Sequence, residues 1–167
     1  MRILDRVSWR VVALLFVILL ALSGCGGGGS PSQPAASTGT GTVTLTNLKD
    51  GQEVPCRLAI EGAYPPSVTD AIWPLVYVDG VYHPQDTPQG SGKSAVKAEG
   101  TWRGNVQFGD CAQSKGQVFQ LVIVTADRGA NKAFEDYLTE TRKTKTYVGT
   151  LLPPGATEQA RISVTRQ

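Results

Sequence analysis

His83 is the only histidine of the 167-residue chain and the first side chain to consider for acid–base chemistry. Serine hydrolysis needs a nucleophile, a histidine base and an orienting carboxylate. The nearest serines and carboxylates along the chain are Ser91, Ser94, Asp79 and Asp86. No Gly-x-Ser-x-Gly motif marks either serine as a nucleophile. We therefore predict a turn histidine and no enzyme, and keep a cell-envelope hydrolase with a site near His83 as the alternative.

Cofactor and metal chemistry find little support in the sequence. The segment 92–94 (Gly-Lys-Ser) imitates the end of a phosphate-binding loop, but Thr87 stands at the first glycine of that motif. Glu135 and Asp136 are neighbours on a predicted helix, so their carboxylates diverge and do not form the facing pair of a glycoside hydrolase. Calcium needs several closely spaced oxygen ligands, and no Asp/Asn cluster supplies them. The sequence predicts neither a cofactor nor a metal site.

Five amphipathic side chains on or beside neighbouring predicted strands form the candidate binding surface. They are Trp73, Tyr77, Tyr82, His83 and Trp102. Exposed rings of this kind offer a stacking surface for a sugar, a peptide or a protein partner. The alternative is that Trp73 and Trp102 belong to the hydrophobic core. We expect residues 82–85 to be the exposed part of this surface.

The first 24 residues have the pattern of an export signal. Positive side chains in residues 1–10 precede an unbroken apolar run of 12 residues from Val11 to Leu22. A membrane-spanning helix needs about 20 such residues, whereas a run of about 7–15 after a basic segment is typical of a signal-peptide core. The sequence Leu22-Ser23-Gly24-Cys25 follows directly.

This four-residue segment resembles the lipobox of bacterial lipoproteins, in which an aliphatic residue and two small residues precede a cysteine. The resemblance implies that the Cys25 thiol receives a diacylglycerol and that a dedicated peptidase cuts just before Cys25. Acyl chains such as palmitate would then hold the protein in the cell membrane or outer membrane, with its domain extracytoplasmic. The alternative is an uncleaved signal anchor with an incidental cysteine.

Residues 25–42 form a predicted flexible tether. They are rich in Gly, Ser, Pro and Thr, carry no charge and hold almost no bulky side chain. Such a segment cannot bury enough apolar surface to fold. About 17 linker residues span roughly 20–25 Å on average, which would hold a domain at 43–167 clear of the lipid headgroups.

Two cysteines, Cys56 and Cys111, remain once Cys25 is assigned to the lipid. An even pair in an exported chain predicts a disulfide, because the compartment outside the cytoplasm is oxidising. Closing a loop of about 55 residues stabilises a fold by about 4 kcal/mol in the chain-entropy model. Two free buried thiols are the alternative. A metal pair is disfavoured, since only His83 could add a further soft ligand.

Alternating apolar and polar residues predict half-buried strands in four segments. These segments are 42–46, 57–61, 102–108 and 160–165. Two more runs, 72–78 and 118–124, are apolar on both faces and are predicted as central strands. Asp79-Gly80 fits a two-residue hairpin turn after the first run, because both positions accept positive φ. Pro74 lacks an N–H group, which predicts a bulge or a local sheet edge at that residue.

One helix is predicted at 128–143. Its apolar stripe recurs at helical spacing and consists of Ala130, Ala133, Phe134, Tyr137 and Leu138. Asp127 is the predicted N-cap, and Arg142 and Lys143 lie near the C-terminal end, where positive charge is favoured. We expect the helix to pack over one end or edge of the strands.

About seven short strands without βα alternation indicate an all-β, antiparallel sandwich with the helix inserted before the last strand. Cys56, then Trp73 on a central strand, then Cys111 resembles the cysteine–tryptophan–cysteine arrangement of immunoglobulin-like domains. The resemblance spans residues 43–167 and implies an immunoglobulin-like sandwich. A fold of this kind does not by itself give a function.

Charge narrows the range of partners. Three of the 16 basic and one of the 14 acidic residues lie in the first 24 positions, so the rest of the chain is balanced. This balance disfavours a nucleic-acid partner, which selects a clustered basic face. The sequence predicts a membrane-anchored lipoprotein whose β-sandwich is a non-enzymatic binding, adhesion or assembly module for a protein or carbohydrate ligand of the cell envelope.

Overall fold

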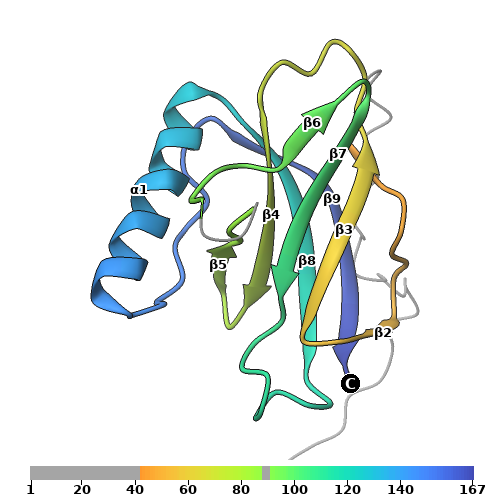
Figure 1. The fold of residues 1–167 in the computed structure, drawn as a ribbon, viewed down its shortest axis with the longest axis vertical. Helices are drawn as coiled ribbons and strands as arrows, with labels where there is room; N and C mark the ends of the chain where they lie inside the picture. Colours follow the sequence, from red (N-terminus) through yellow and green to blue (C-terminus); the bar gives the residue numbers. More distant parts are fainter. Residues whose placement is uncertain (1–41, 88–90) are drawn as a thin grey trace, which may run out of the picture. The chain divides into compact units, whose positions relative to one another are not determined.

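The computed structural model describes residues 42–87 and 91–167. The predicted signal peptide (1–24), the lipidation site Cys25 and nearly all of the tether (25–42) lie outside this part. The described part contains nine strands and one helix (Figure 1). In chain order they are β1 (Thr44–Leu45), β2 (Gln52–Val54), β3 (Arg57–Ala63), β4 (Ala71–Val78), β5 (Val81–Pro84), β6 (Val96–Ala98), β7 (Thr101–Gln107), β8 (Val118–Ala126), α1 (Arg128–Thr144) and β9 (Ala156–Arg166).

The strands form two sheets. The first has the order β1-β3-β7-β6 and is antiparallel. The second has the order β2-β9-β8-β4-β5, and within it β2 runs parallel to β9. When the short β2 and β5 are set aside, the first sheet holds the first, second, fourth and fifth strands and the other holds the third, sixth and seventh. This is the strand division of an immunoglobulin-like sandwich, so the predicted fold class is confirmed, with the helix before the last strand.

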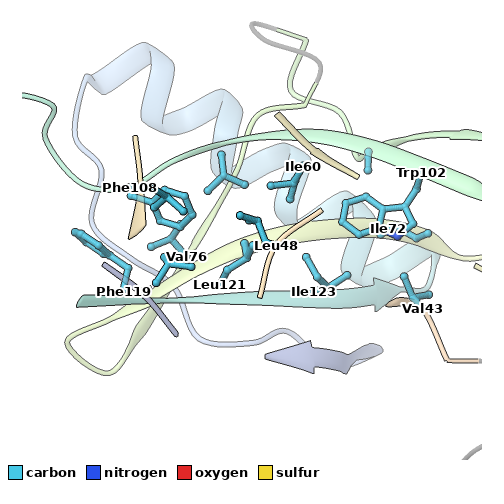
Figure 2. Close-up of a cluster of buried hydrophobic side chains, with 14 residues drawn as sticks. Val43, Leu48, Ile60, Ile72, Val76, Trp102, Phe108, Phe119, Leu121 and Ile123 are labelled. Atoms are coloured by element: carbon cyan, nitrogen blue, oxygen red, sulfur yellow. The ribbon is translucent and has the colours of Figure 1, made fainter. Parts of the chain in front are cut away.

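The space between the sheets holds the main hydrophobic core (Figure 2). Period-two alternation directs Trp102, Val106 and Phe108 into this space, while Arg103 and Gln107 between them are exposed. The facing sheet contributes Ile72, Val76, Phe119, Leu121 and Ile123. Each large apolar side chain buried in this way contributes about 1.5–3 kcal/mol to folding.

α1 covers the outer face of the second sheet, so the expectation that it packs over an end or edge was wrong. Phe134 and Leu138 of the helix pack with Trp73 of β4 and with Val122 and Val124 of β8, which makes a second core. β4 and β8 are apolar on both faces, and a third layer is needed to keep their outer side chains from water. The helix forms that layer (Figure 1).

The helix limits agree with the sequence to within one residue, 128–143 against Arg128–Thr144. Asp127 is the N-cap as predicted, and its Oδ1 accepts a hydrogen bond from the Ala130 N–H at 2.8 Å. The predicted basic residues occupy the last turn, where they complement the helix dipole.

Pro74 lies inside β4, a strand that has β5 on one side and β8 on the other. The ladder between β4 and β5 begins only at Leu75, so Pro74 lies just past its end. The Pro74 carbonyl points to that side, where it accepts a hydrogen bond from the Gln85 N–H at 3.1 Å. An N–H at this residue would point the same way. The prediction of a local sheet edge is therefore confirmed.

Cys56 and Cys111 form the predicted disulfide, with their Cα atoms 5.2 Å apart. The bond joins the residue before β3 to the loop between β7 and β8. The cysteine–tryptophan–cysteine resemblance does not extend to the packing, because Trp73 faces α1 and Trp102 fills the core between the sheets. The strand order, and not the position of a tryptophan, carries the likeness to immunoglobulin-like domains.

The sequence does not predict β2 or β6, each of which is three residues long. A segment this short is below the length at which a period-two pattern becomes visible. β2 pairs with β9 from the far end of the chain, and β6 pairs with Thr101–Arg103 of β7. Tertiary pairing, and not local preference, makes these segments strands.

Gly62 of β3 lies where a side chain has no room. A Cβ atom at this position would overlap the carbonyl oxygen of Thr44 and the indole of Trp102. We expect Gly62→Ala to lower the free energy of unfolding by about 3 kcal/mol, measured by urea denaturation. Gly129→Ala is the matched control, because a Cβ there meets nothing closer than 3.4 Å and alanine favours a helix over glycine by about 0.5–1 kcal/mol. Equal stability of the two variants would contradict the steric argument.

Candidate functional site

The two tryptophans of the predicted binding surface are core residues. Trp73 is 0% exposed, packs against Phe134 with ring centroids 5.3 Å apart, and donates from Nε1 to Asn131 Oδ1 at 2.8 Å. Trp102 is also 0% exposed and donates from Nε1 to the Thr44 carbonyl at 3.1 Å. Both indole N–H groups are satisfied internally, so these side chains drop out of the candidate surface. The core alternative that the sequence left open is the one the structure shows.

Tyr77 and Tyr82 pair across β4 and β5 with ring centroids 4.8 Å apart. Arg161 of β9 lies over the Tyr77 ring at 4.9 Å and donates to the Tyr82 hydroxyl at 3.2 Å. It also donates to Glu158 at 2.7 Å, and this hydrogen bond raises the pKa of Arg161 above its ordinary value. The permanent cation engages the ring face of Tyr77 within the protein itself, so this cluster is best explained as a structural one.

His83, by contrast, lines a groove with a volume of about 930 Å³. The groove runs between the four-stranded sheet and the end of α1, and we call it the β5–β7 groove. Val76, Val78 and Phe119 form its apolar floor and also belong to, or pack against, the core between the sheets. Burial lowers the pKa of the His83 imidazole, and the charge of Asp79 opposes that effect more weakly.

Polar side chains line the walls of the groove. One wall comes from the first sheet and includes Arg57, Asn105 and Gln107. The other comes from α1 and the segment after it and includes Tyr137, Thr141, Arg142 and Tyr147. Burial raises the pKa of the Tyr137 hydroxyl, which donates to the Val148 carbonyl at 3.0 Å. The site combines hydrogen-bonding groups with an apolar floor, as small-ligand sites do.

The groove exists because β6 is shorter than β7. β3 pairs with β7 over Thr101–Gln107, whereas β6 pairs only with Thr101–Arg103. The chain before β6 leaves the first sheet, since the Ala95 N–H donates to the Ile72 carbonyl of β4 at 2.8 Å. Among residues 42–87 and 91–167, no strand therefore pairs with the second half of β7 on the side away from β3, and that side borders the groove.

Gln85 crosses the groove and links its two sides. Its Nε2 donates to the His83 carbonyl at 2.9 Å, and its Oε1 accepts from the Gln107 N–H at 2.9 Å. The Gln85 side-chain oxygen thus accepts from the Gln107 N–H in the place where a carbonyl of a neighbouring strand would accept. This contact fixes the separation of β5 and β7 at one end of the groove.

The two carboxylates that line the groove have structural partners. Asp86 forms an ion pair with Arg142 and accepts a hydrogen bond from the Gly92 N–H at 2.7 Å. Asp110 accepts from the N–H groups of Ala112 and Gln113 at 2.7 and 3.1 Å. The Asp86 contacts attach the segment after β5 to α1, and the Asp110 contacts shape a turn. Neither set is arranged around His83.

Sequence reasoning singled out the segment 82–85 and missed the other residues that line the groove. It expected His83 in a turn and residues 82–85 exposed, and both expectations were wrong. His83 lies inside β5, Tyr82, His83 and Gln85 are half-buried, and Pro84 is buried. His83, Pro84 and Gln85 line the groove. Asn105, Gln107, Arg142 and Tyr147 come from three further segments that tertiary packing brings together. No local pattern marks them, because the groove is a consequence of unequal strand lengths.

Among residues 42–87 and 91–167, no group of three or more His, Cys, Asp or Glu side chains is placed to hold a metal ion. Within the same residues, no helix has the length and apolar character needed to cross a membrane. Comparison of the chain with known proteins finds no matching family model and no matching curated protein.

His83 makes stability depend on pH. Its pKa in the folded protein is below the ordinary value of 6.5, so the unfolded chain binds a proton at a higher pH than the folded one. The free energy of unfolding is therefore expected to fall as the pH is lowered through about 6.5 towards 5. His83→Gln should flatten this slope, because the chain has no other histidine. Urea denaturation at pH 7.5, 6.5 and 5.5 measures this pH dependence. Identical slopes for the wild type and His83→Gln would refute the attribution of the pH dependence to His83.

Proposed function

We propose that this chain is a lipoprotein of the bacterial cell envelope, anchored through Cys25, whose β-sandwich is a non-enzymatic binding domain outside the cytoplasm. The apolar run at residues 11–22 and the small residues before Cys25 support export and acylation. The disulfide between Cys56 and Cys111 supports an oxidising compartment. Residues 25–42 would act as a flexible spacer between the lipid and the domain.

The observation that carries the binding function is the β5–β7 groove. Its volume of about 930 Å³ lies within the range of small-ligand sites. Its floor is apolar, and His83, Asn105 and Tyr147 offer hydrogen-bonding groups around it. The formal charges of the lining residues cancel, with Arg57 and Arg142 against Asp86 and Asp110. This composition favours an uncharged ligand with several polar groups, such as a peptide segment or a neutral sugar of the envelope.

Binding is better supported than hydrolysis. Catalysis at His83 would need a nucleophile and an orienting carboxylate beside the ring. Ser91 and Ser94 are not among the described residues that line the groove, and Asp86 is engaged by Arg142 and the Gly92 N–H. The hydrolase alternative therefore has no observation in its favour.

Replacement of the Cys25 thiol tests the anchor. In cells supplied with labelled palmitate, the wild-type protein is expected to take up label and to sediment with membranes. Cys25→Ala should lose the label. The test rests on the label, because the uncut apolar segment could still hold this variant in the membrane fraction. The double variant Cys56→Ala/Cys111→Ala is the control and should keep its label. An unlabelled wild type, or a Cys25→Ala protein that keeps its label, would exclude the lipoprotein assignment.

The groove is tested with two side chains of one segment. Tyr147 and Leu151 are 62% and 75% exposed, but only Tyr147 lines the groove. The probes are a fluorescent uncharged heptapeptide and a fluorescent tetramer of N-acetylglucosamine, each titrated with full-length protein in detergent micelles. We expect Tyr147→Ala to weaken the binding of one probe about tenfold, and Leu151→Ala to change it less than twofold. Equal effects of the two variants, or no binding of either probe, would count against a ligand site in this groove.

A further inference from the structure

Within the part of the chain that the structure describes, no strand pairs with the second half of β7 on the side away from β3. The Gln107 N–H points away from β3, because it donates to the side chain of Gln85. Backbone groups two residues apart on a strand point to the same side. The N–H and C=O of Asn105 therefore also point away from β3, beyond the last residue that β6 pairs, Arg103. The backbone groups of Asn105 and Gln107 that face the groove therefore have the two-residue spacing that a paired strand requires.

We propose that the β5–β7 groove binds an extended peptide that adds to β7 as an antiparallel strand and continues the line of β6. This inference rests on the proposed binding function and names the ligand class. Main-chain hydrogen bonds at Asn105 would give affinity, and pockets for alternate side chains would give specificity, as in other cases of strand addition.

Three observations select a peptide over a sugar. The free edge needs a donor and an acceptor at two-residue spacing, which a polypeptide backbone supplies. The amide of Gln85 already meets Gln107 in the way a guest backbone would. The floor of Val76, Val78 and Phe119 lies between the sheets, where every second side chain of an added strand would point.

Charge and position define the partner further. The lining charges balance, so an uncharged segment is the complementary one. After the proposed cut before Cys25, the remaining tether at residues 26–41 contains no Val, Leu, Ile or aromatic side chain to cover the floor. The occupant that we propose is therefore a separate polypeptide. The opposite side of the groove is closed to strand pairing. Tyr82 of β5 exchanges backbone hydrogen bonds of 2.8 Å with Thr150, and Pro84 has no N–H to offer. The guest therefore pairs along one side only.

N-methylation of the guest tests this geometry without altering the protein. The probe is a blocked, fluorescent Ser-Val-Thr-Val-Thr-Val-Ser peptide, titrated by anisotropy with full-length protein in detergent micelles. One alternating set of its N–H groups would face β7 and the other would face away. Methylation of the first set should weaken binding at least tenfold, and methylation of the second set less than threefold. Equal effects of the two sets would overturn strand addition.

A matched pair of variants tests the protein side. Asn105→Pro removes the N–H that faces the groove, while the hydrogen bonds from β7 to β3 use the alternate residues. It should weaken peptide binding about tenfold, whereas Asn105→Ala, which keeps the N–H, should change it less than threefold. If circular dichroism shows that Asn105→Pro is unfolded, the comparison of the two sets of N-methylated peptides alone tests strand addition.

The outcomes separate this inference from the function on which it rests. Tyr147-dependent binding of the peptide, with equal effects of the two methylated sets, would leave a binding groove but refute strand addition. Tyr147-dependent binding of the N-acetylglucosamine tetramer alone would also keep the groove and refute a peptide ligand. Failure of both probes to bind would refute the two proposals together.

Discussion

The two-sided burial of β4 and β8 is the constraint on which the rest of the structure depends. Both strands carry large apolar side chains on each face, such as Ile72 and Trp73 on β4 and Leu121 and Val122 on β8. Covering one face requires the four-stranded sheet, and covering the other requires α1. The order of elements follows, because a helix placed between β8 and β9 can fold back over the outer face before the last strand completes the sheet.

Where this cover stops, the molecule uses polar chemistry instead. At the border of the core under α1, Tyr77 and Tyr82 pack against that core while they stay partly exposed. Arg161 lies over the Tyr77 ring and donates to Tyr82 and Gln120. The Arg161 guanidinium stacks on the Tyr77 ring and donates to oxygens of Tyr82, Gln120 and Glu158. It shields aromatic surface from water and stays charged. This contact explains why Tyr77 and Tyr82, which the sequence suggests as part of a binding surface, have a structural role.

Local rules account for the parts of this fold that depend on neighbouring residues. Alternation predicts β7, the Asp127 cap predicts the helix start, and Asp79-Gly80, with φ of 52° and 83°, makes the expected hairpin turn. Local rules fail where two distant segments decide. Trp73 lies on a strand that is apolar on both faces, so nothing in its own segment states whether its ring packs between the sheets or under α1. For Trp102 the alternation of β7 does predict the side, since it places the ring with Val106 and Phe108. β2 and β6 are likewise strands only because a distant partner pairs with them.

The β5–β7 groove is another feature that distant segments determine. The strand edges around it differ in how they are covered. Unpaired edges are a liability for β-proteins, which usually blunt them. Here Thr150 pairs with Tyr82 and Pro84 ends β5, so that edge is closed. Lys97 of β6 donates to the carbonyls of Val68 and Asp70 at 2.6 and 3.1 Å, which ties down the strand at the other side. Among the described residues, no strand pairs with the second half of β7 on the side that borders the groove, and the Gln85 side chain meets the Gln107 N–H there. The strand addition that we propose would replace this side-chain contact with a set of backbone hydrogen bonds.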